Sequence, residues 1–135
     1  MLTMPMNRRD AVVATCVRAL PNEGCGVLIG NDEGVVVEVW PSTNISNSAK
    51  IYEIEPLTML RASRRADDLG LEVIGVFHSH THSDAYPSPT DILQAPDPSW
   101  HYLLVSLRLV PSVLRSFRII NGRVTEEPVT LVESR

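Results

Sequence analysis

Residues 78–91 contain side chains that could bind a metal ion. His78 and His80 lie two positions apart, directly after an apolar run, and Asp91 follows further along the chain. Residues i and i+2 of a strand point to the same face, so both imidazoles can aim at one point if the strand continues that far. Two histidine nitrogens and one carboxylate oxygen make a three-ligand zinc set, in which a catalytic zinc keeps its fourth position open for water.

The same stretch also has ordinary structural explanations. Ser88 and Asp91 fit a capping box, with Ser88 as the N-cap of a helix and Pro89 at its first position. A His-x-His pair at a strand end is a weak metal signal by itself. His82 is a third candidate ligand, and spacing alone does not choose among the three histidines.

Length and composition indicate one globular domain that covers residues 1–135. The chain is 44% hydrophobic and 21% charged, an ordinary balance for a domain with a real core. The net charge of −4 gives no nucleic-acid footprint, so we expect no nucleic-acid partner. No signal peptide or membrane-spanning apolar run is recognisable, and Cys16 and Cys25 are too few for a disulfide framework. We therefore expect a cytoplasmic protein with free thiols and no membrane contact.

The hydrophobic pattern predicts a mixed α/β fold in which helices flank one sheet. The expected helices cover residues 8–20, 56–69 and 91–95, and the expected strands cover residues 26–30, 35–40, 51–54, 71–77, 101–107, 112–120 and 123–125. Residues 1–6 are expected to be loose or a short strand, and residues 128–132 to add an edge strand. The run 71–77 is near-continuously apolar, as a strand buried on both faces should be.

Helical spacing also predicts which side chains of the two longer helices face inward. For the first helix these are Val13, Cys16, Val17 and Leu20. For the second helix they are Leu57, Leu60, Ala62, Ala66 and Leu69.

The chain resembles the JAMM (MPN+) metallopeptidases. Their signature is an upstream Glu, then H-[ST]-H, seven residues, Ser, two residues and Asp. Here these are Glu23, His78-Ser79-His80, Ser88 and Asp91, with residues 81–87 as the seven. By itself Glu23 would be taken for an exposed loop acid, and the joint match is far more specific than any fragment. The resemblance implies a single MPN/JAMM (cytidine deaminase-like) domain.

The resemblance assigns roles to these positions. It implies that His78, His80 and Asp91 bind one Zn²⁺ per chain and leaves His82 outside the ligand set. Glu23 would accept a proton from the attacking water, and Ser88 would donate a hydrogen bond to the developing oxyanion. For substrate binding we expect three residues of the neighbouring loops: Tyr86, Thr81 and Asn44.

A closer likeness links the chain to bacterial JAMM peptidases of the Mec type. Residues 78–91, 101–106, 115–122 and 124–129 carry it. Such enzymes act on ubiquitin-like sulfur carrier proteins that end in Gly-Gly, and the Mec type releases cysteine from the carrier's last glycine. A related type trims a short C-terminal extension. Both serve sulfur transfer and the biosynthesis of cysteine or sulfur-containing metabolites.

Two other functions fit the same family. One is an isopeptidase that removes ubiquitin-like modifiers from proteins. The other is a non-catalytic MPN scaffold, although such members typically lack the ligand set that this chain has. The sequence leaves open the carrier, the residues released, the pathway and the oligomeric state, a homodimer included.

Overall fold

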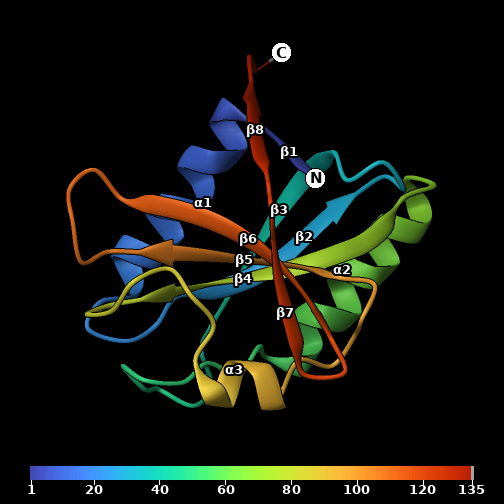
Figure 1. The fold of residues 1–135 in the computed structure, drawn as a ribbon. Coiled ribbons are helices and arrows are strands. Elements are labelled where there is room, and N and C mark those ends of the chain that lie inside the picture. The colour runs from blue at the N-terminus through green and yellow to red at the C-terminus, as the bar shows by residue number, and fades with distance from the viewer. Residues whose placement is uncertain (135) are drawn as a thin grey trace.

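The computed structural model describes residues 1–134. Its main sheet has six strands in the order β3-β2-β4-β5-β6-β7, and β1 and β8 form a separate two-stranded sheet (Figure 1). The elements are β1 (Leu2–Pro5), α1 (Met6–Ala19), β2 (Cys25–Gly30), β3 (Val36–Ser42), α2 (Pro56–Asp68), β4 (Glu72–His80), α3 (Pro89–Leu93), β5 (His101–Ser106), β6 (Val113–Ile120), β7 (Arg123–Glu127) and β8 (Val129–Val132). The predicted mixed α/β fold is confirmed.

Strand β4 lies in the middle of the sheet and is buried from Ile74 to its end. It pairs antiparallel with β2 and parallel with β5. The pairing with β5 continues through His80, which is opposite Ser106. The strand therefore extends beyond residue 77, where the apolar run ends, because backbone pairing on both sides holds the two histidines in extended conformation.

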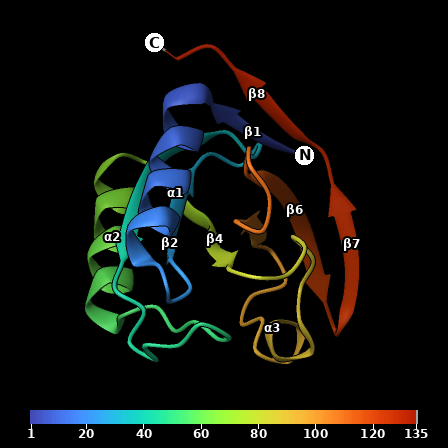
Figure 2. The same cartoon turned by 90° about the vertical axis from the view of Figure 1, so that its left-hand side faces the viewer.

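Helices α1 and α2 pack on opposite faces of the sheet (Figures 1 and 2). Val12 and Cys16 of α1 belong to the core cluster that contains Leu28. Ala62 and Ala66 of α2 pack in a second cluster with the neighbouring residues of β2, Val27 and Ile29. Alternate residues of β2 thus serve the two helices, as the two-residue period of a strand requires.

The expected inward faces of both helices were partly wrong. Val17 and Leu20 are 50% and 46% exposed, while Val12 and Cys16 are fully buried. The buried stripe of α1 is narrower than its apolar pattern, because the helix contacts the sheet along one line and Val17 faces a surface cavity. In α2 only the two alanines are buried, because their small side chains allow the helix to lie close to the sheet. Leu57 and Leu60 of the helix and Leu69 just after it are exposed.

Two expectations about strands also need correction. Residues 51–54 form no strand, and Ile54 makes only an isolated bridge with Asn44. The tail strand β8 exists, but it pairs in parallel with β1 and adds no edge to the main sheet. The turn between β6 and β7 is as expected, with positive φ at Asn121 and Gly122. No helix in residues 1–134 is both long and apolar enough to cross a membrane.

A buried polar cluster ties β5, β6 and β7 together away from the histidine pair. Glu127 Oε2 lies 2.7 Å from His101 Nδ1 and accepts a hydrogen bond of 2.8 Å from Ser116 Oγ. Burial raises the pKa of Glu127, but the hydrogen bonds from His101 and Ser116 outweigh it and lower the pKa to about 2. A carboxylate with a lowered folded-state pKa stabilises the fold above its ordinary pKa, and this stability is lost as pH falls.

We therefore expect Glu127→Gln to lower the free energy of unfolding by about 1–3 kcal/mol at pH 7, because His101 and Ser116 lose a charged acceptor. The loss should shrink as pH falls from about 4.5 towards 2, where the wild-type carboxylate becomes protonated. Denaturant unfolding across this pH range measures both effects. Glu33→Gln, at an exposed turn, is the control, and an equal effect in the two variants would contradict the prediction.

Candidate metal centre

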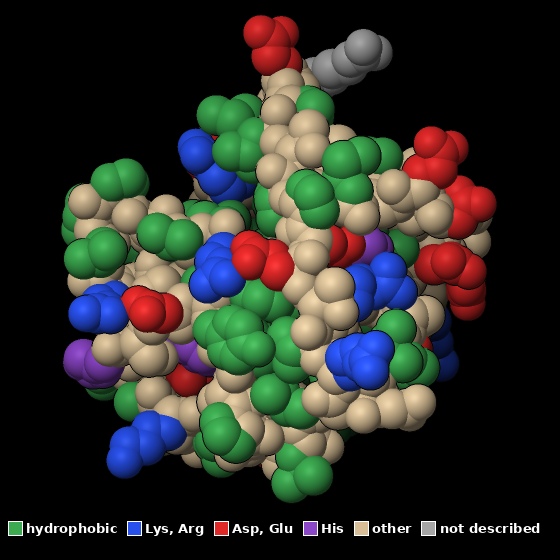
Figure 3. Space-filling model, in the orientation of Figure 1, with side chains coloured by type: hydrophobic (Ala, Val, Ile, Leu, Met, Phe, Trp, Pro, Cys, Tyr) green, Lys and Arg blue, Asp and Glu red, His purple; other side chains and the backbone are tan. Residues whose placement is uncertain are grey.

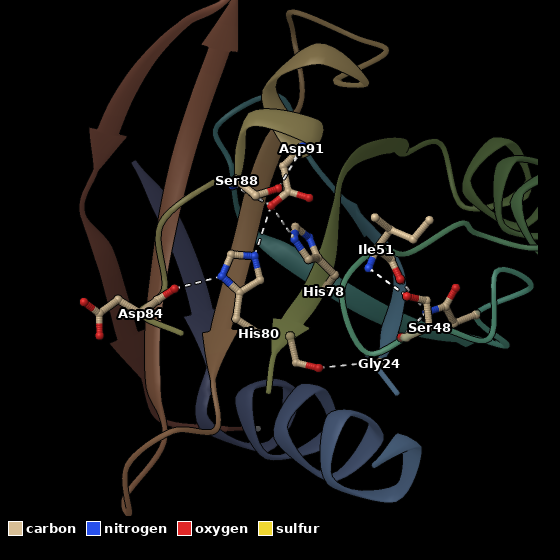
Figure 4. A network of polar contacts seen from close by, with 10 residues as sticks. Gly24, Ser48, Ile51, His78, His80, Asp84, Ser88 and Asp91 are labelled. Atoms are coloured by element: carbon tan, nitrogen blue, oxygen red, sulfur yellow. Dashed lines mark hydrogen bonds and ion pairs between the residues drawn. The ribbon is translucent and has the colours of Figure 1, made fainter. Parts of the chain in front are cut away.

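The C-terminal end of β4 presents His78 and His80 on the same face of the sheet. Asp91 of α3 approaches this pair from the opposite side (Figure 4). Its Oδ2 lies 3.1 Å from His78 Nε2 and 3.0 Å from His80 Nε2. Two imidazoles and one carboxylate therefore converge on a single point, as the spacing in the sequence predicts.

The helix cap and the histidine cluster share one carboxylate. Ser88 Oγ accepts from the Asp91 backbone N–H at 3.0 Å, and Asp91 Oδ2 accepts from the Ser88 backbone N–H at 2.9 Å. This is the predicted capping box. The capping box is compatible with a metal site, because the hydrogen bonds that begin α3 also point Asp91 at the histidines.

The electrostatics of the cluster suit a cation. Burial raises the pKa of Asp91, but hydrogen bonds from His78 and His80 outweigh this and hold the pKa well below its usual range. Burial lowers the pKa of His78, which favours the neutral imidazole that a metal needs. Burial also lowers the pKa of His80, but the hydrogen bonds with Asp91 and the Asp84 carbonyl outweigh this and raise it. The site thus combines one carboxylate charge with a neutral nitrogen donor at His78.

The ligand geometry fits a tetrahedral ion such as zinc. The candidate donor atoms of His78, His80 and Asp91 lie within 4.8 Å of one another. Donors about 2.0–2.2 Å from one tetrahedral ion lie about 3.3–3.6 Å apart, close to the 3.1 and 3.0 Å that separate Asp91 Oδ2 from the two Nε2 atoms. His80 Nδ1 lies 2.8 Å from the carbonyl oxygen of Asp84. In the neutral tautomer that donates this hydrogen bond from Nδ1, Nε2 has the lone pair that a metal needs.

Tyr52 is a site residue that the sequence reasoning missed. Its ring stacks on His78 with centroids 4.1 Å apart and an interplanar angle of 15°. This contact fixes the plane of the His78 imidazole. The only sequence signal was the alternating stretch 51–54, which we interpreted as a strand.

Glu23 is buried beside the triad, although the sequence alone suggested an exposed loop. It is 3% exposed, and its Oε1 has no hydrogen-bond partner among the described residues. Burial raises the pKa of Glu23 to about 8, and the charges of His80 and Asp91 act in opposite directions. An unpartnered buried carboxylate oxygen is costly, so it indicates a ligand or water partner.

Ser79 holds the Glu23 segment against β4. Its Oγ accepts a hydrogen bond of 2.9 Å from the Gly24 N–H, and its own N–H donates to the Gly24 carbonyl at 3.0 Å. Gly24 is required here because a Cβ would lie 2.6 Å from Cys16 Cα. The middle residue of His-Ser-His therefore points away from the ligands and fixes the position of Glu23.

A cavity of about 390 Å³ opens next to the triad. Its wall contains Glu23, His80, Ser88 and Thr81, with Ala49, Lys50, His82 and Ser83. The C-terminal end of β4 lies at the left of Figure 1, and the same edge in Figure 3 shows histidines among side chains of both charges.

The other two expected substrate-binding residues lie outside this cavity wall. Tyr86 is half exposed and makes an edge contact with the ring of Phe117 at 5.4 Å. The Asn44 side chain donates to the carbonyl oxygens of Glu23 and Ile51 and accepts from the Glu53 N–H. The amide of Asn44 thus organises the loop that covers Glu23.

Three candidate metal ligands beside a cavity, with a carboxylate nearby, are typical of single-ion metal hydrolases. Residues 6–120 match the family of prokaryotic homologues of the JAB domain. The chain is 41% identical over 126 residues to the CysO-cysteine peptidase of Mycobacterium tuberculosis, which covers 92% of this chain and 86% of that protein. It is 30% identical over 111 residues to a desampylase of Haloferax volcanii, covering 78% and 80%.

Solved structures of other proteins have the same fold. A solution structure from Desulfitobacterium hafniense has a TM-score of 0.91 at 35% identity and covers 99% of this chain and 94% of that one. A JAB1/MPN domain protein from Archaeoglobus fulgidus shares the fold, with a TM-score of 0.64 at 17% identity over 98% of both chains. The chain belongs to the prokaryotic JAB-domain family, which confirms the resemblance to JAMM peptidases and its class as a hydrolase.

We expect His78→Ala and Asp91→Asn each to remove most of the bound zinc, because each deletes one of only three protein donors. Elemental analysis of purified, zinc-loaded protein measures the metal content per chain. His82→Ala is the matched control, since His82 lies outside the triad, and it should retain zinc. Zinc lost from the control and kept by the other two variants would mean that the wrong histidine was assigned.

We expect Ser79→Ala to lower the free energy of unfolding by about 1–3 kcal/mol and to reduce turnover while zinc remains bound. The Gly24 N–H loses its buried acceptor, so the Glu23 segment is held less firmly. Thermal unfolding, zinc content and kcat are measured together. Ser79→Thr keeps the acceptor oxygen and should restore part of kcat; an alanine variant with full stability and activity would refute this role.

Proposed function

We propose that this protein is a zinc-dependent peptidase that cuts the bond after the C-terminal glycine of a ubiquitin-like sulfur carrier protein. It would release cysteine or a short C-terminal extension. One observation carries the proposal: His78, His80 and Asp91 converge beside the buried, unpartnered carboxylate of Glu23. The 41% identity to a CysO-cysteine peptidase supports the substrate class.

His78, His80 and Asp91 would hold one zinc ion. Bound there, zinc would supply Lewis acidity and lower the pKa of a water molecule to about 7. The stacking of Tyr52 on His78 and the hydrogen bond that the Asp84 carbonyl accepts from His80 keep both rings oriented for this role. Their contribution is to make the site rigid before substrate arrives.

Glu23 would accept the proton of the attacking water and pass it to the leaving amine. Its burial favours the protonated form, whereas a nearby dication favours the carboxylate, so the two effects bring Glu23 towards a pKa useful for both steps. The Glu23 backbone is held on both sides, since its N–H donates to Ser48 O at 2.8 Å and its carbonyl accepts from Asn44.

Ser88 would stabilise the oxyanion that forms on the glycine carbonyl. Its Oγ already accepts from the Asp91 N–H, which leaves its hydroxyl hydrogen free to donate. An oxyanion donor of this kind is worth about 2.7–4 kcal/mol where one has been removed from another enzyme. The cap would therefore also orient Ser88 towards the substrate.

The carrier's tail would approach between residues 42–49 and 81–87, with its Gly-Gly end and the residue beyond it in one groove. Glycine residues fit narrow grooves because they have no side chains. We assign Thr81 to the groove wall, Asn44 to the shape of the covering loop, and Tyr86 to the outer rim. An extended tail would bind chiefly through its backbone, as peptides do along loops and strands.

We also propose that residues 1–135 act as one catalytic domain and that the enzyme works in the cytoplasm. Both cysteines are free, buried thiols, in keeping with a reducing compartment.

We expect Glu23→Gln to bind zinc as wild type does and to lose at least about 100-fold in kcat, because general acid–base catalysis contributes about that much or more. The assay incubates the zinc-loaded protein with CysO that carries one C-terminal cysteine and follows loss of that residue by mass spectrometry. A fully active Glu23→Gln variant would remove Glu23 as the base.

The same assay separates the alternatives. A carrier joined to a lysine side chain of another protein tests the isopeptidase function, which the desampylase relative makes worth measuring. If the wild-type protein binds zinc and cleaves neither substrate, the peptidase proposal is wrong.

A further inference from the structure

The cavity beside Glu23 has a second wall, of which the roles above use only Thr81. Residues 49–50 and 81–83 form this wall, and the two segments are far apart in the chain. A hydrogen bond of 3.4 Å from Thr81 Oγ1 to the Ala49 carbonyl joins the two loops. The wall is thus a built part of the site.

The volume of the cavity limits what can occupy it. Its size is about 390 Å³, whereas an engineered cavity of about 150 Å³ holds benzene. The space fits one or two amino-acid residues and excludes a folded domain. It therefore suits the small leaving part of a substrate, and the carrier domain must lie on the other side of the cleaved bond.

The charge of this wall points to an anion. Lys50 is the only lysine in the sequence, and it lines the cavity. Its ammonium group makes no hydrogen bond or ion pair within residues 1–134. Arg108 pairs with Asp84, which follows residues 81–83, at 2.7 Å, so its charge is already partnered. Lys50 is therefore the wall's cation available to a ligand, and the hydroxyl of Thr81 and the ring of His82 add polar contacts beside it.

We propose that this cavity binds the residue that leaves, and that Lys50 engages its free α-carboxylate. The inference rests on the proposed peptidase function and makes it more specific. Hydrolysis adds a water oxygen to the glycine carbonyl carbon, breaks the C–N bond and delivers a proton to the amine nitrogen. In an amino acid the α-carboxylate is one carbon away from that nitrogen, so it departs within the same cavity. A lysine side chain of another protein offers no such carboxylate.

The experiment compares two substrates that differ only at the terminus. CysO with one added C-terminal cysteine is prepared with a free carboxylate and, by semisynthesis, with a terminal amide. Zinc-loaded wild type should show a kcat/KM about threefold to tenfold higher for the acid, the range of a partly exposed ion pair. Lys50→Gln should lose this preference by losing activity on the acid alone, and Lys50→Arg should restore it.

A binding measurement checks the same point without turnover. In the Glu23→Gln background, calorimetry should show the acid binding more tightly than the amide, and Lys50→Gln should abolish that difference. Arg64→Gln removes one positive charge from an exposed position of α2, outside the cavity wall. It should leave the affinity for both substrates unchanged.

The outcomes separate the two levels of the proposal. Cleavage of both substrates with equal efficiency, or an equal effect of Lys50→Gln on both, overturns the carboxylate site and leaves the peptidase function standing. Cleavage of neither substrate by zinc-loaded wild type overturns the peptidase function and this inference with it.

Discussion

The site depends on the convergence of two imidazole nitrogens on one carboxylate oxygen. Asp91 Oδ2 lies about equally far from His78 and His80, and it also accepts the backbone N–H of Ser88. An ionised carboxylate in so buried a place requires several donors or a cation. The five-residue helix α3 is too short to be stable by itself, so its capping box and this convergence support each other.

The side chains on the two faces of strand β4 have different roles. His78 and His80 point to the face that carries the triad, and Ser79 between them points to the face covered by α1, where it holds Gly24. A strand with a period of two residues separates these roles without any insertion. The candidate metal ligands and the position of Glu23 are therefore coupled through three consecutive residues, and a shift of register would move all of them together.

The sequence could predict what is local. The spacing of the histidines, the capping box and the turn at Asn121-Gly122 depend on neighbours within a few residues, and each was correct. It could not predict the exposure of Val17, because helical periodicity does not say how wide a stripe the sheet will cover. Nor could it place Tyr52 on His78, since the loop that carries Tyr52 lacks a strand and is positioned by contacts from distant segments.

Glu23 is the clearest case of a residue defined by distant partners. Its segment alone suggests an exposed loop, and it is buried only because β2 pairs with β4 and Asn44 holds the covering loop over it. A buried carboxylate oxygen without a partner destabilises a fold, and a glutamine or alanine would cost less there. The fold tolerates this group at the edge of a polar cavity, next to a cluster that suits a dication. A local loss of stability of this kind is typical of residues that take part in a reaction. Packing alone does not account for Glu23 at this position, so Glu23 is the strongest evidence for the reaction.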